Sequence, residues 1–224
     1  RCRIVLIFQW RPGSFLMSKI EAVIFDMDGV LIDAKDWHFE ALNKALDLFG
    51  MTISRYDHLV TFDGLPTSKK LEMLSLERGL PRKLHPFINK MKQNYTTEFV
   101  FTRCNPLFQH EYALSRLKGE GYRLAVCSNS IRKTVELMLS RARIDHYFDY
   151  TMSNEDVSRP KPDPEMYVKM MKKMELAPES VLILEDNDHG VKAALGSGAH
   201  LLKIGSVSDV SYLAIKSRIK EIEG

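Results

Sequence analysis

A short apolar segment that ends in two aspartates constrains the fold of this chain more than any other feature. The β-prone run Val23–Phe25 is followed by Asp26, Asp28 and Gly29. Two carboxylates this close repel each other unless a cation or a shared proton relieves them. Open α/β sheets bind their ligands beyond the carboxyl ends of parallel strands. The segment therefore favours a parallel sheet with a hard-cation site, with Mg²⁺ as the expected ion, although Asp-x-Asp-Gly is also compatible with a simple turn.

Apolar runs alternate with helical patterns along most of the chain. The helical patterns cover Ile131–Arg141, a segment that starts at Asp163-Pro164, and a segment through Val191 that stops near Gly196 or Gly198. Strands that alternate with helices predict an α/β fold, in which helices cover both faces of a parallel sheet. The expected strands are Ala22–Asp26, Arg123–Cys127, Tyr147–Met152, Val181–Glu185 and Leu201–Ile204.

The stretch from about Asp36 to about Asn105 breaks this alternation, because it carries helical patterns and no strand signal. Breakers such as Gly50, Gly64 and Gly79 separate its helical units. We therefore predict a Rossmann-like core made of residues 17–34 and 106–224, with an all-helical cap inserted at residues 35–105.

Residues 1–16 form a stretch without any acidic residue. Its apolar run is shorter than the core of a signal peptide and lacks a small-residue cleavage pattern. A targeting peptide remains one interpretation; we favour the other, an N-terminal extension outside the fold that precedes a start at Met17.

The net charge of +3 comes from Arg1, Arg3 and Arg11 in this stretch, and the rest of the chain has 29 basic and 29 acidic residues. That balance argues against a nucleic-acid-binding face. The absence of a long apolar run argues against a membrane span. Three cysteines without paired spacing argue against disulfides and zinc, and they suit a cytoplasmic location.

Three more polar clusters follow or flank the expected strands. Ser128-Asn129-Ser130 precedes a helix and can cradle an anion, although an ordinary helix cap also explains it. Lys161 lies among three prolines, which would hold its charge in one direction for a phosphate, or else form a stiff linker. Glu185-Asp186-Asn187-Asp188 repeats the acidic pattern after a second apolar run, where a helix cap is again the alternative.

The four clusters in this order resemble the motifs of the haloacid dehalogenase superfamily of phosphotransferases. The resemblance spans about Ile20 to Gly205, and it rests on Asp-x-Asp-Gly-Val, Ser-Asn-Ser, Lys-Pro-x-Pro and Glu-Asp-Asn-x-x-Gly. It implies a Rossmann-like core with a helical cap that closes over a small phosphorylated substrate.

The resemblance also implies roles for individual residues. Asp26 would be the nucleophile that forms an aspartyl-phosphate, and Asp28 the general acid and then base. Asp26, the backbone carbonyl of Asp28 and Asp186 would hold Mg²⁺. Ser128 and Asn129 would bind phosphate oxygens, while Lys161 would neutralise the nucleophile and the transferring group. Glu185 or Asp188 would order metal-bound water.

Within the superfamily, the chain is most similar to the beta-phosphoglucomutase-like and phosphoglycolate-phosphatase-like group. His38 aligns with a histidine that helps control cap closure, and Lys69 and Lys70 are candidate substrate contacts in the cap. Thr67 and Thr97 align where the mutase has cationic cap residues.

We therefore predict a magnesium-dependent phosphatase for a sugar phosphate or nucleotide monophosphate, acting as a monomer or weak dimer. The alternatives are a phosphomutase and a non-catalytic binding relative.

Overall fold

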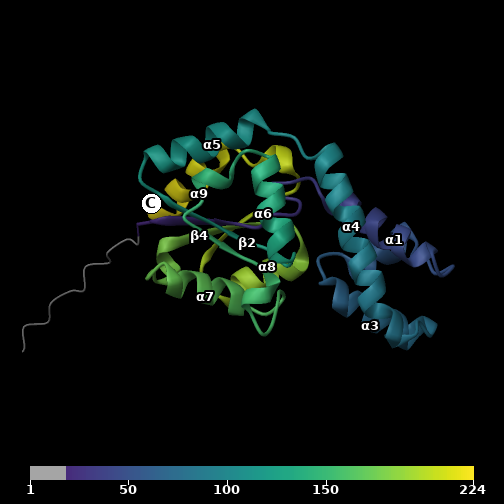
Figure 1. Cartoon of the computed structure of the whole chain (residues 1–224). Coiled ribbons are helices and arrows are strands. Elements are labelled where there is room, and N and C mark those ends of the chain that lie inside the picture. Colours follow the sequence, from purple (N-terminus) through teal and green to yellow (C-terminus); the bar gives the residue numbers. More distant parts are fainter. Residues whose placement is uncertain (1–18) are drawn as a thin grey trace, which may run out of the picture.

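Five parallel strands form one sheet in the order β3-β2-β1-β4-β5 (Figure 1). The computed structural model describes residues 19–224, so the prediction about residues 1–16 lies outside the described part. The α/β fold and all five predicted strands are confirmed, although the third strand begins at Tyr150 and not at Tyr147, which ends a short 3₁₀ turn (residues 145–147). The strands are β1 (Ala22–Phe25), β2 (Arg123–Cys127), β3 (Tyr150–Met152), β4 (Val181–Glu185) and β5 (His200–Lys203).

The central strand β1 is buried on both faces of the sheet. Val23 and Phe25 point into one apolar core, and Ala22 and Ile24 point into the other. In register, Ile24 lies between Ala125 of β2 and Ile183 of β4. A parallel strand that is covered on both sides needs apolar residues at every position, which is why β1 reads as a continuous apolar run.

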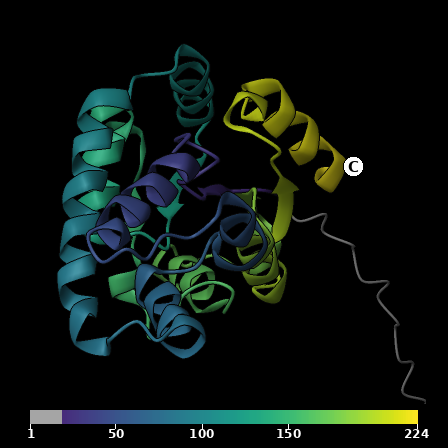
Figure 2. The same cartoon turned by 90° about the vertical axis from the view of Figure 1, so that its right-hand side faces the viewer.

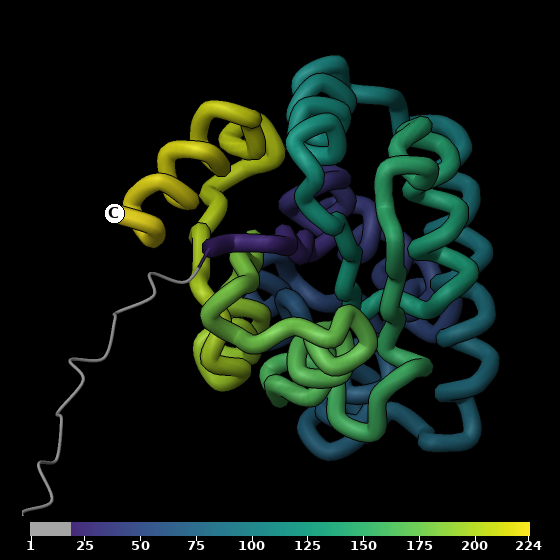
Figure 3. The backbone as a smooth tube through the Cα atoms, turned by 90° about the vertical axis from the view of Figure 1, so that its left-hand side faces the viewer, coloured from purple at the N-terminus to yellow at the C-terminus, as the bar shows by residue number. Residues whose placement is uncertain are grey.

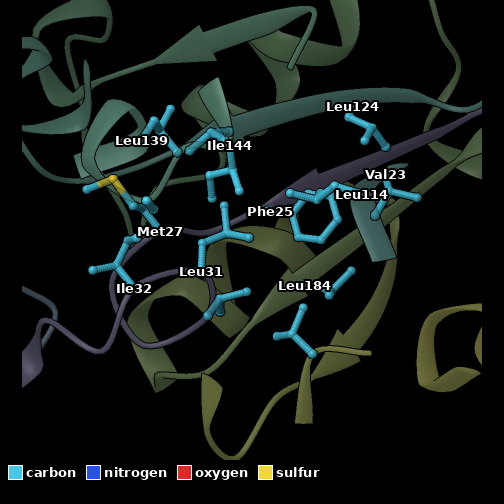
Figure 4. Close-up of a cluster of buried hydrophobic side chains, with 14 of the residues drawn as sticks. Val23, Phe25, Met27, Leu31, Ile32, Leu114, Leu124, Leu139, Ile144 and Leu184 are labelled. Carbon is cyan, nitrogen blue, oxygen red and sulfur yellow. The ribbon is translucent and has the colours of Figure 1, made fainter. Parts of the chain in front are cut away.

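Helices cover both faces of the sheet, as the alternating pattern predicts. One face packs against α5 (Phe108–Gly119), α6 (Arg132–Arg141) and α9 (Tyr212–Glu223). The other face packs against α7 (Glu165–Lys173) and α8 (Asp188–Gly196). Figure 3 shows these two layers of helices on either side of the strands. Figure 4 shows Phe25, Leu124 and Leu184, from three neighbouring strands, meeting Leu114 of α5 in the first core.

The described residues between β1 and α5 form helices and turns, with no further strand of the sheet (Figure 2). We call Lys35–Arg103 the helical insert. It has an apolar core of its own, which includes Leu42, Phe62, Leu71 and Ile88. Its elements are α1 (Lys35–Asp47), α2 (Arg55–Asp57), the π-helical η1 (His58–Phe62), α3 (Thr67–Arg78), the 3₁₀ turn η2 (Arg82–Leu84) and α4 (His85–Arg103).

Two helices that follow the site loops start close to the predicted positions. The backbone N–H of Glu165 donates to Asp163 Oδ1 (3.0 Å), one residue beyond the expected start of α7. The N–H of Gly190 donates to Asn187 Oδ1 (3.0 Å), so Asn187 caps α8. Within residues 19–224, no helix combines the length and apolar character that crossing a membrane requires.

Candidate active site

The acidic residues after β1 and β4 lie at the point where the order of the strands reverses. β2 and β3 lie on one side of β1, whereas β4 and β5 lie on the other. Open α/β sheets bind ligands at such a switch point, beyond the carboxyl ends of the strands. Asp26 and Asp186 follow these two adjacent strands directly. The loop after β1 passes close to Asp186 at Gly29, where only glycine fits: its φ is 97°, and a Cβ there would lie 2.1 Å from Asp186 Oδ2.

Lys161 lies at the centre of the acidic group. Its Nζ donates to Asp26 Oδ1 (2.7 Å), Glu185 Oε1 (2.6 Å) and the carbonyl of Cys127 (2.8 Å). Burial alone would lower the pKa of Lys161, but the charges of Asp26 and Glu185 raise that pKa above its ordinary value. Burial first, and then the charge of Glu185, raise the pKa of Asp26, while Lys161 acts in the opposite direction. The lysine is therefore charged and held against the carboxylate that is the predicted nucleophile.

Three carboxylates around this lysine lie close enough together to hold one metal ion. Asp26, Glu185 and Asp186 each place one oxygen within 4.8 Å of the other two. Oδ2 of Asp186 is buried and accepts no hydrogen bond from the described residues, although Lys35 Nζ lies 2.5 Å away as an ion pair. Oxygen-only ligands with excess negative charge suit Mg²⁺.

The predicted metal set differs from this cluster in one member. The side chain of Glu185 belongs to the carboxylate cluster, whereas that of Asp28 does not. Coordination by the backbone carbonyl of Asp28 stays a prediction. Glu185 is fully buried, because Gly190 of α8 packs on its carboxylate: a Cβ on Gly190 would lie 2.0 Å from it.

The side chain of Asp28 faces a separate set of polar groups. Ser130 Oγ donates to Asp28 Oδ2 (3.0 Å), and His38 Nε2 lies 2.9 Å from Asp28 Oδ1. Burial works to raise the pKa of Asp28, but the interaction with His38, followed by the hydrogen bond from Ser130 and the nearby Lys92, brings that pKa below its ordinary value. Asp28 is thus ionised and oriented by two side chains in this conformation.

His38 connects Asp28 to the helical insert. Lys92 Nζ of α4 lies 3.1 Å from His38 Nδ1, while His38 Nε2 faces the carboxylate of Asp28. An ionised carboxylate can only accept, so His38 donates from Nε2 to Asp28, and Nδ1 of the neutral ring accepts from Lys92. Burial and the charge of Lys92 lower the pKa of His38, which favours this neutral ring. The sequence analysis selected His38 but missed Lys92.

The two residues predicted to bind phosphate make several contacts within the protein. Ser128 is fully buried, and its Oγ accepts from the N–H of Ser130 (3.0 Å) and approaches Asp28 Oδ2 (3.4 Å). It does not line the cavity, whereas Ser130 does. The Asn129 amide donates to the carbonyls of Gly64 (3.0 Å) and Lys161 (3.1 Å), linking the core to the insert. Ser130 is thus the accessible hydroxyl of this cluster; the sequence analysis included it in the cluster but gave the individual phosphate contacts to Ser128 and Asn129.

A single cavity joins the acidic edge of the sheet to the helical insert. It holds about 1010 Å³ of empty space, part of which is open solvent, and Asp26, Asp28 and Lys161 line it from the core side. From the insert, the basic and titratable residues that line it are Lys35, His38, His58, Asp63, Lys70 and Lys92.

Two predicted candidates lie outside this cavity. Lys69 is exposed and does not line it, which argues against a substrate contact there; its neighbour Lys70 lines it. The side chain of Asp188 is 84% exposed and lies 3.4 Å from Lys203, so this conformation gives it no role in ordering metal-bound water.

The sequence matches the haloacid dehalogenase-like hydrolase family over residues 23–204. The phosphorylated carbohydrates phosphatase of Thermotoga maritima is 29% identical over 220 residues, which cover 91% of this chain and 100% of that protein. The pyrophosphatase PpaX of Bacillus mycoides is 25% identical over 195 residues, covering 83% and 84% of the two chains.

The fold also matches a solved structure. The beta-phosphoglucomutase of Clostridium difficile superposes with a TM-score of 0.78 at 20% identity, covering 90% of this chain and 98% of the other. At that identity the likeness concerns the fold alone. The family match over most of the chain establishes the family: the chain belongs to the haloacid dehalogenase-like hydrolases.

Proposed function

We propose that this protein is a magnesium-dependent phosphatase that hydrolyses a small phosphorylated metabolite through an aspartyl-phosphate on Asp26. The observation that carries the proposal is that two carboxylates only two positions apart in the sequence have entirely different contacts. Asp26 contacts Lys161 within the carboxylate cluster, whereas Asp28 contacts His38 and Ser130. One carboxylate is thus placed for nucleophilic attack and the other for proton transfer. The name of the Thermotoga maritima relative supports a phosphorylated carbohydrate as substrate.

The reaction consists of two displacements at phosphorus. An oxygen of Asp26 bonds to the phosphorus, the ester P–O bond breaks, and the leaving oxygen takes a proton from Asp28. Asp28 then takes a proton from water, whose oxygen displaces Asp26 and releases inorganic phosphate. Lys161 offsets the charge of Asp26 and of the transferring group throughout. A bound Mg²⁺ would neutralise further charge between Asp26, Asp186 and the phosphate.

The contacts of Asp28 favour its role as a base over its role as an acid. Its lowered pKa makes it ready for the base step. The acid step requires a proton on Asp28, and therefore a change in its contact with His38. Because His38 belongs to the insert and also contacts Lys92, movement of the insert as substrate binds would couple closure to proton transfer.

The test is release of phosphate from a panel of sugar phosphates and nucleotide monophosphates with Mg²⁺. Quenching the reaction rapidly with ³²P-labelled substrate should trap the label on Asp26. Label on a serine or histidine would contradict the mechanism, and the absence of turnover on every member of the panel would contradict the function.

A phosphomutase is the second candidate, and one observation favours keeping it. Thr67 and Thr97 stand where cationic cap residues were expected, but Lys70 and Lys92 line the cavity from other positions. A mutase needs such groups to hold a non-transferring phosphate while water is excluded. Isomerisation of glucose 1-phosphate that depends on a bisphosphate, with little free phosphate, would select the mutase. Steady release of phosphate without a bisphosphate activator would select the phosphatase.

A further inference from the structure

Lys35 lies where the chain passes from the core into the helical insert. It is the first residue of α1, and the residue before it, Ala34, is fully buried in the first apolar core. Leu42, two turns further along α1, belongs to the apolar core of the insert. The side chain of Lys35 lines the cavity and is 36% exposed. Its backbone is therefore anchored, while its ammonium group has solvent into which it can move.

The ammonium group of Lys35 lies against an oxygen of the carboxylate cluster. Its Nζ is 2.5 Å from Oδ2 of Asp186, whose side chain is fully buried. Within residues 19–224, no donor makes a hydrogen bond to this Oδ2, whereas the Asn187 amide donates to Oδ1 (3.3 Å). A buried carboxylate oxygen needs a compensating positive group. Lys35 supplies that group in this conformation.

The loop after β1 leaves a path for this contact at Gly29. A Cβ on Gly29 would lie 2.5 Å from Cε of Lys35 and 2.1 Å from Oδ2 of Asp186. The stem of the lysine and the carboxylate thus meet over a bare backbone. Any other residue at position 29 would block the approach of Lys35 to Asp186.

The charges around Asp186 suit one further cation and not two. Asp26, Glu185 and Asp186 supply three formal negative charges, and Lys161 offsets one of them. Lys35 offsets a second, whereas Mg²⁺ in its place would balance the group. Mg²⁺ binds a carboxylate oxygen at about 2.0–2.1 Å, so it would need the same buried oxygen that Lys35 approaches. Two cations at that oxygen repel each other.

We propose that Lys35 competes with Mg²⁺ for Asp186: the ammonium group pairs with Oδ2 until a bound divalent cation displaces it into the cavity. The inference rests on the magnesium dependence in the proposed function and adds a control on that site. Because binding of the metal breaks an ion pair, the affinity is lower than the three carboxylates alone would give. The exchange also removes one contact between the first residue of the insert and the core.

Titration with Mn²⁺, followed by electron paramagnetic resonance, measures this competition without turnover. Lys35→Met should bind Mn²⁺ about 3- to 10-fold more tightly than the wild type, because the ion pair no longer has to break. Lys35→Gln, a second neutral variant, should change the affinity in the same direction. Lys44→Met is the matched control: Lys44 also lies on α1, but it pairs with Glu98 (4.0 Å) and does not line the cavity. It should keep the wild-type affinity, and equal affinities of Lys35→Met and the wild type would overturn the proposal.

Thermal unfolding distinguishes displacement of Lys35 from simple repulsion of the metal. In excess chelator, Lys35→Met should melt about 2–4 °C below the wild type, because Asp186 is then buried without its cation. In saturating Mg²⁺ this difference should disappear, because the metal has replaced the lysine in both proteins. A lysine that repelled the metal without pairing with Asp186 would give equal melting temperatures in chelator, and that result would also overturn the proposal.

These measurements separate the inference from the proposed function. If the affinities and melting temperatures follow the expected pattern but no substrate of the panel is hydrolysed, the competition stands and the proposed function is wrong. If phosphate is released with Mg²⁺ but Lys35→Met changes neither quantity, the function stands and the competition is wrong. Absence of Mn²⁺ binding by the wild type and by every variant would overturn the competition together with the magnesium dependence.

Discussion

The two walls of the cavity hold their charges in opposite ways. On the core wall, the carboxylates of Asp26, Glu185 and Asp186 surround one fully buried lysine, Lys161. On the insert wall, Lys70 and Lys92 are equally buried but form no ion pair with a described carboxylate. The core wall therefore has an excess of negative charge and needs a cation, whereas the insert wall has an excess of positive charge.

This difference shows that a buried lysine can either stabilise or destabilise the fold, depending on its partners. Lys161 is part of a complete network, so removing it leaves the buried carboxylates of its partners without a compensating positive charge. Lys70 lacks such a network, so removing it relieves the fold of an unpaired charge. The predictions below test this contrast, beginning with the largest expected effect.

Asp26→Asn should abolish turnover while leaving the fold intact. An amide does not form the acyl-phosphate at a useful rate, and loss of a nucleophile lowers kcat by on the order of 10⁴–10⁶-fold. Asparagine keeps an oxygen that can accept from Lys161, so the melting temperature should change little. Phosphate release and thermal unfolding of the purified variant measure the two effects. Turnover close to that of the wild type would remove Asp26 from the chemistry of the core wall.

Lys161→Met should impair both activity and stability. Loss of one preorganised electrostatic donor lowers kcat by on the order of 10²–10³-fold. The variant leaves Asp26 and Glu185 buried without their cation, which should reduce the free energy of unfolding by about 3–5 kcal/mol. Arginine should not restore activity, because its planar fork does not fit the place of a compact ammonium. Chemical denaturation and steady-state kinetics give the two numbers, and an unchanged free energy of unfolding would contradict the network.

Asp186→Asn should weaken the binding of Mg²⁺ to the core wall. Excess chelator should stop hydrolysis by the wild type, and the variant should need about 10- to 100-fold more Mg²⁺ for half-maximal activity. Ca²⁺ should inhibit, because its larger and looser coordination shell misplaces the nucleophile. Titration with Mn²⁺, followed by electron paramagnetic resonance, measures the affinity independently of turnover. Hydrolysis that persists in chelator would show that the carboxylate cluster does not serve a metal.

Lys70→Met should stabilise the protein at neutral pH, in contrast to Lys161→Met. The pKa of Lys70 falls from 10.5 to about 8 on folding, so burial of its charge destabilises the fold by on the order of 1–3 kcal/mol. Below pH 8 the lysine is charged in both states and this penalty is constant. Between pH 8 and 10.5 the unfolded chain binds a proton that the folded protein has lost, so wild-type stability rises with pH relative to the variant.

Urea denaturation of the wild type and Lys70→Met at several pH values measures the difference between their free energies of unfolding. We expect the variant to be more stable up to pH 8 and its advantage to decline toward pH 10.5. Lys69→Met should show no such dependence, because Lys69 is exposed. A wild type that is the more stable protein at neutral pH would show that Lys70 has a partner in solution.

Local sequence signals determined the core half of the candidate site. Asp26 directly follows an apolar run and Asp186 follows one after Glu185, and parallel strands bring their carboxyl ends to the same edge of a sheet. The prolines around Lys161 marked it as a held charge, and its contacts with Asp26 and Glu185 agree with that interpretation. The family resemblance supplied the chemical roles, which the proposed experiments test.

The insert half of the site depended on tertiary packing. Lys92 belongs to a buried ladder in which Ile88, Lys92, Thr96 and Val100 follow one another at intervals of four residues. That spacing was readable, but a lysine is usually exposed, so nothing in the sequence marked Lys92 as a residue of the cavity. Lys35, which pairs with Asp186, carried no signal, because its partner lies 151 positions away and only the fold brings them together.

The adjacent lysines Lys69 and Lys70 show the limit of what the sequence alone can predict. The sequence by itself determined an α/β fold, a helical insert, an acidic pair beside a held lysine, and a lysine pair at the start of a helix. Neighbouring residues on a helix point about 100° apart, so one of the two lysines could face the cavity while the other faced solvent. Only the packing of α3 against the rest of the insert decided that Lys70 is the buried one.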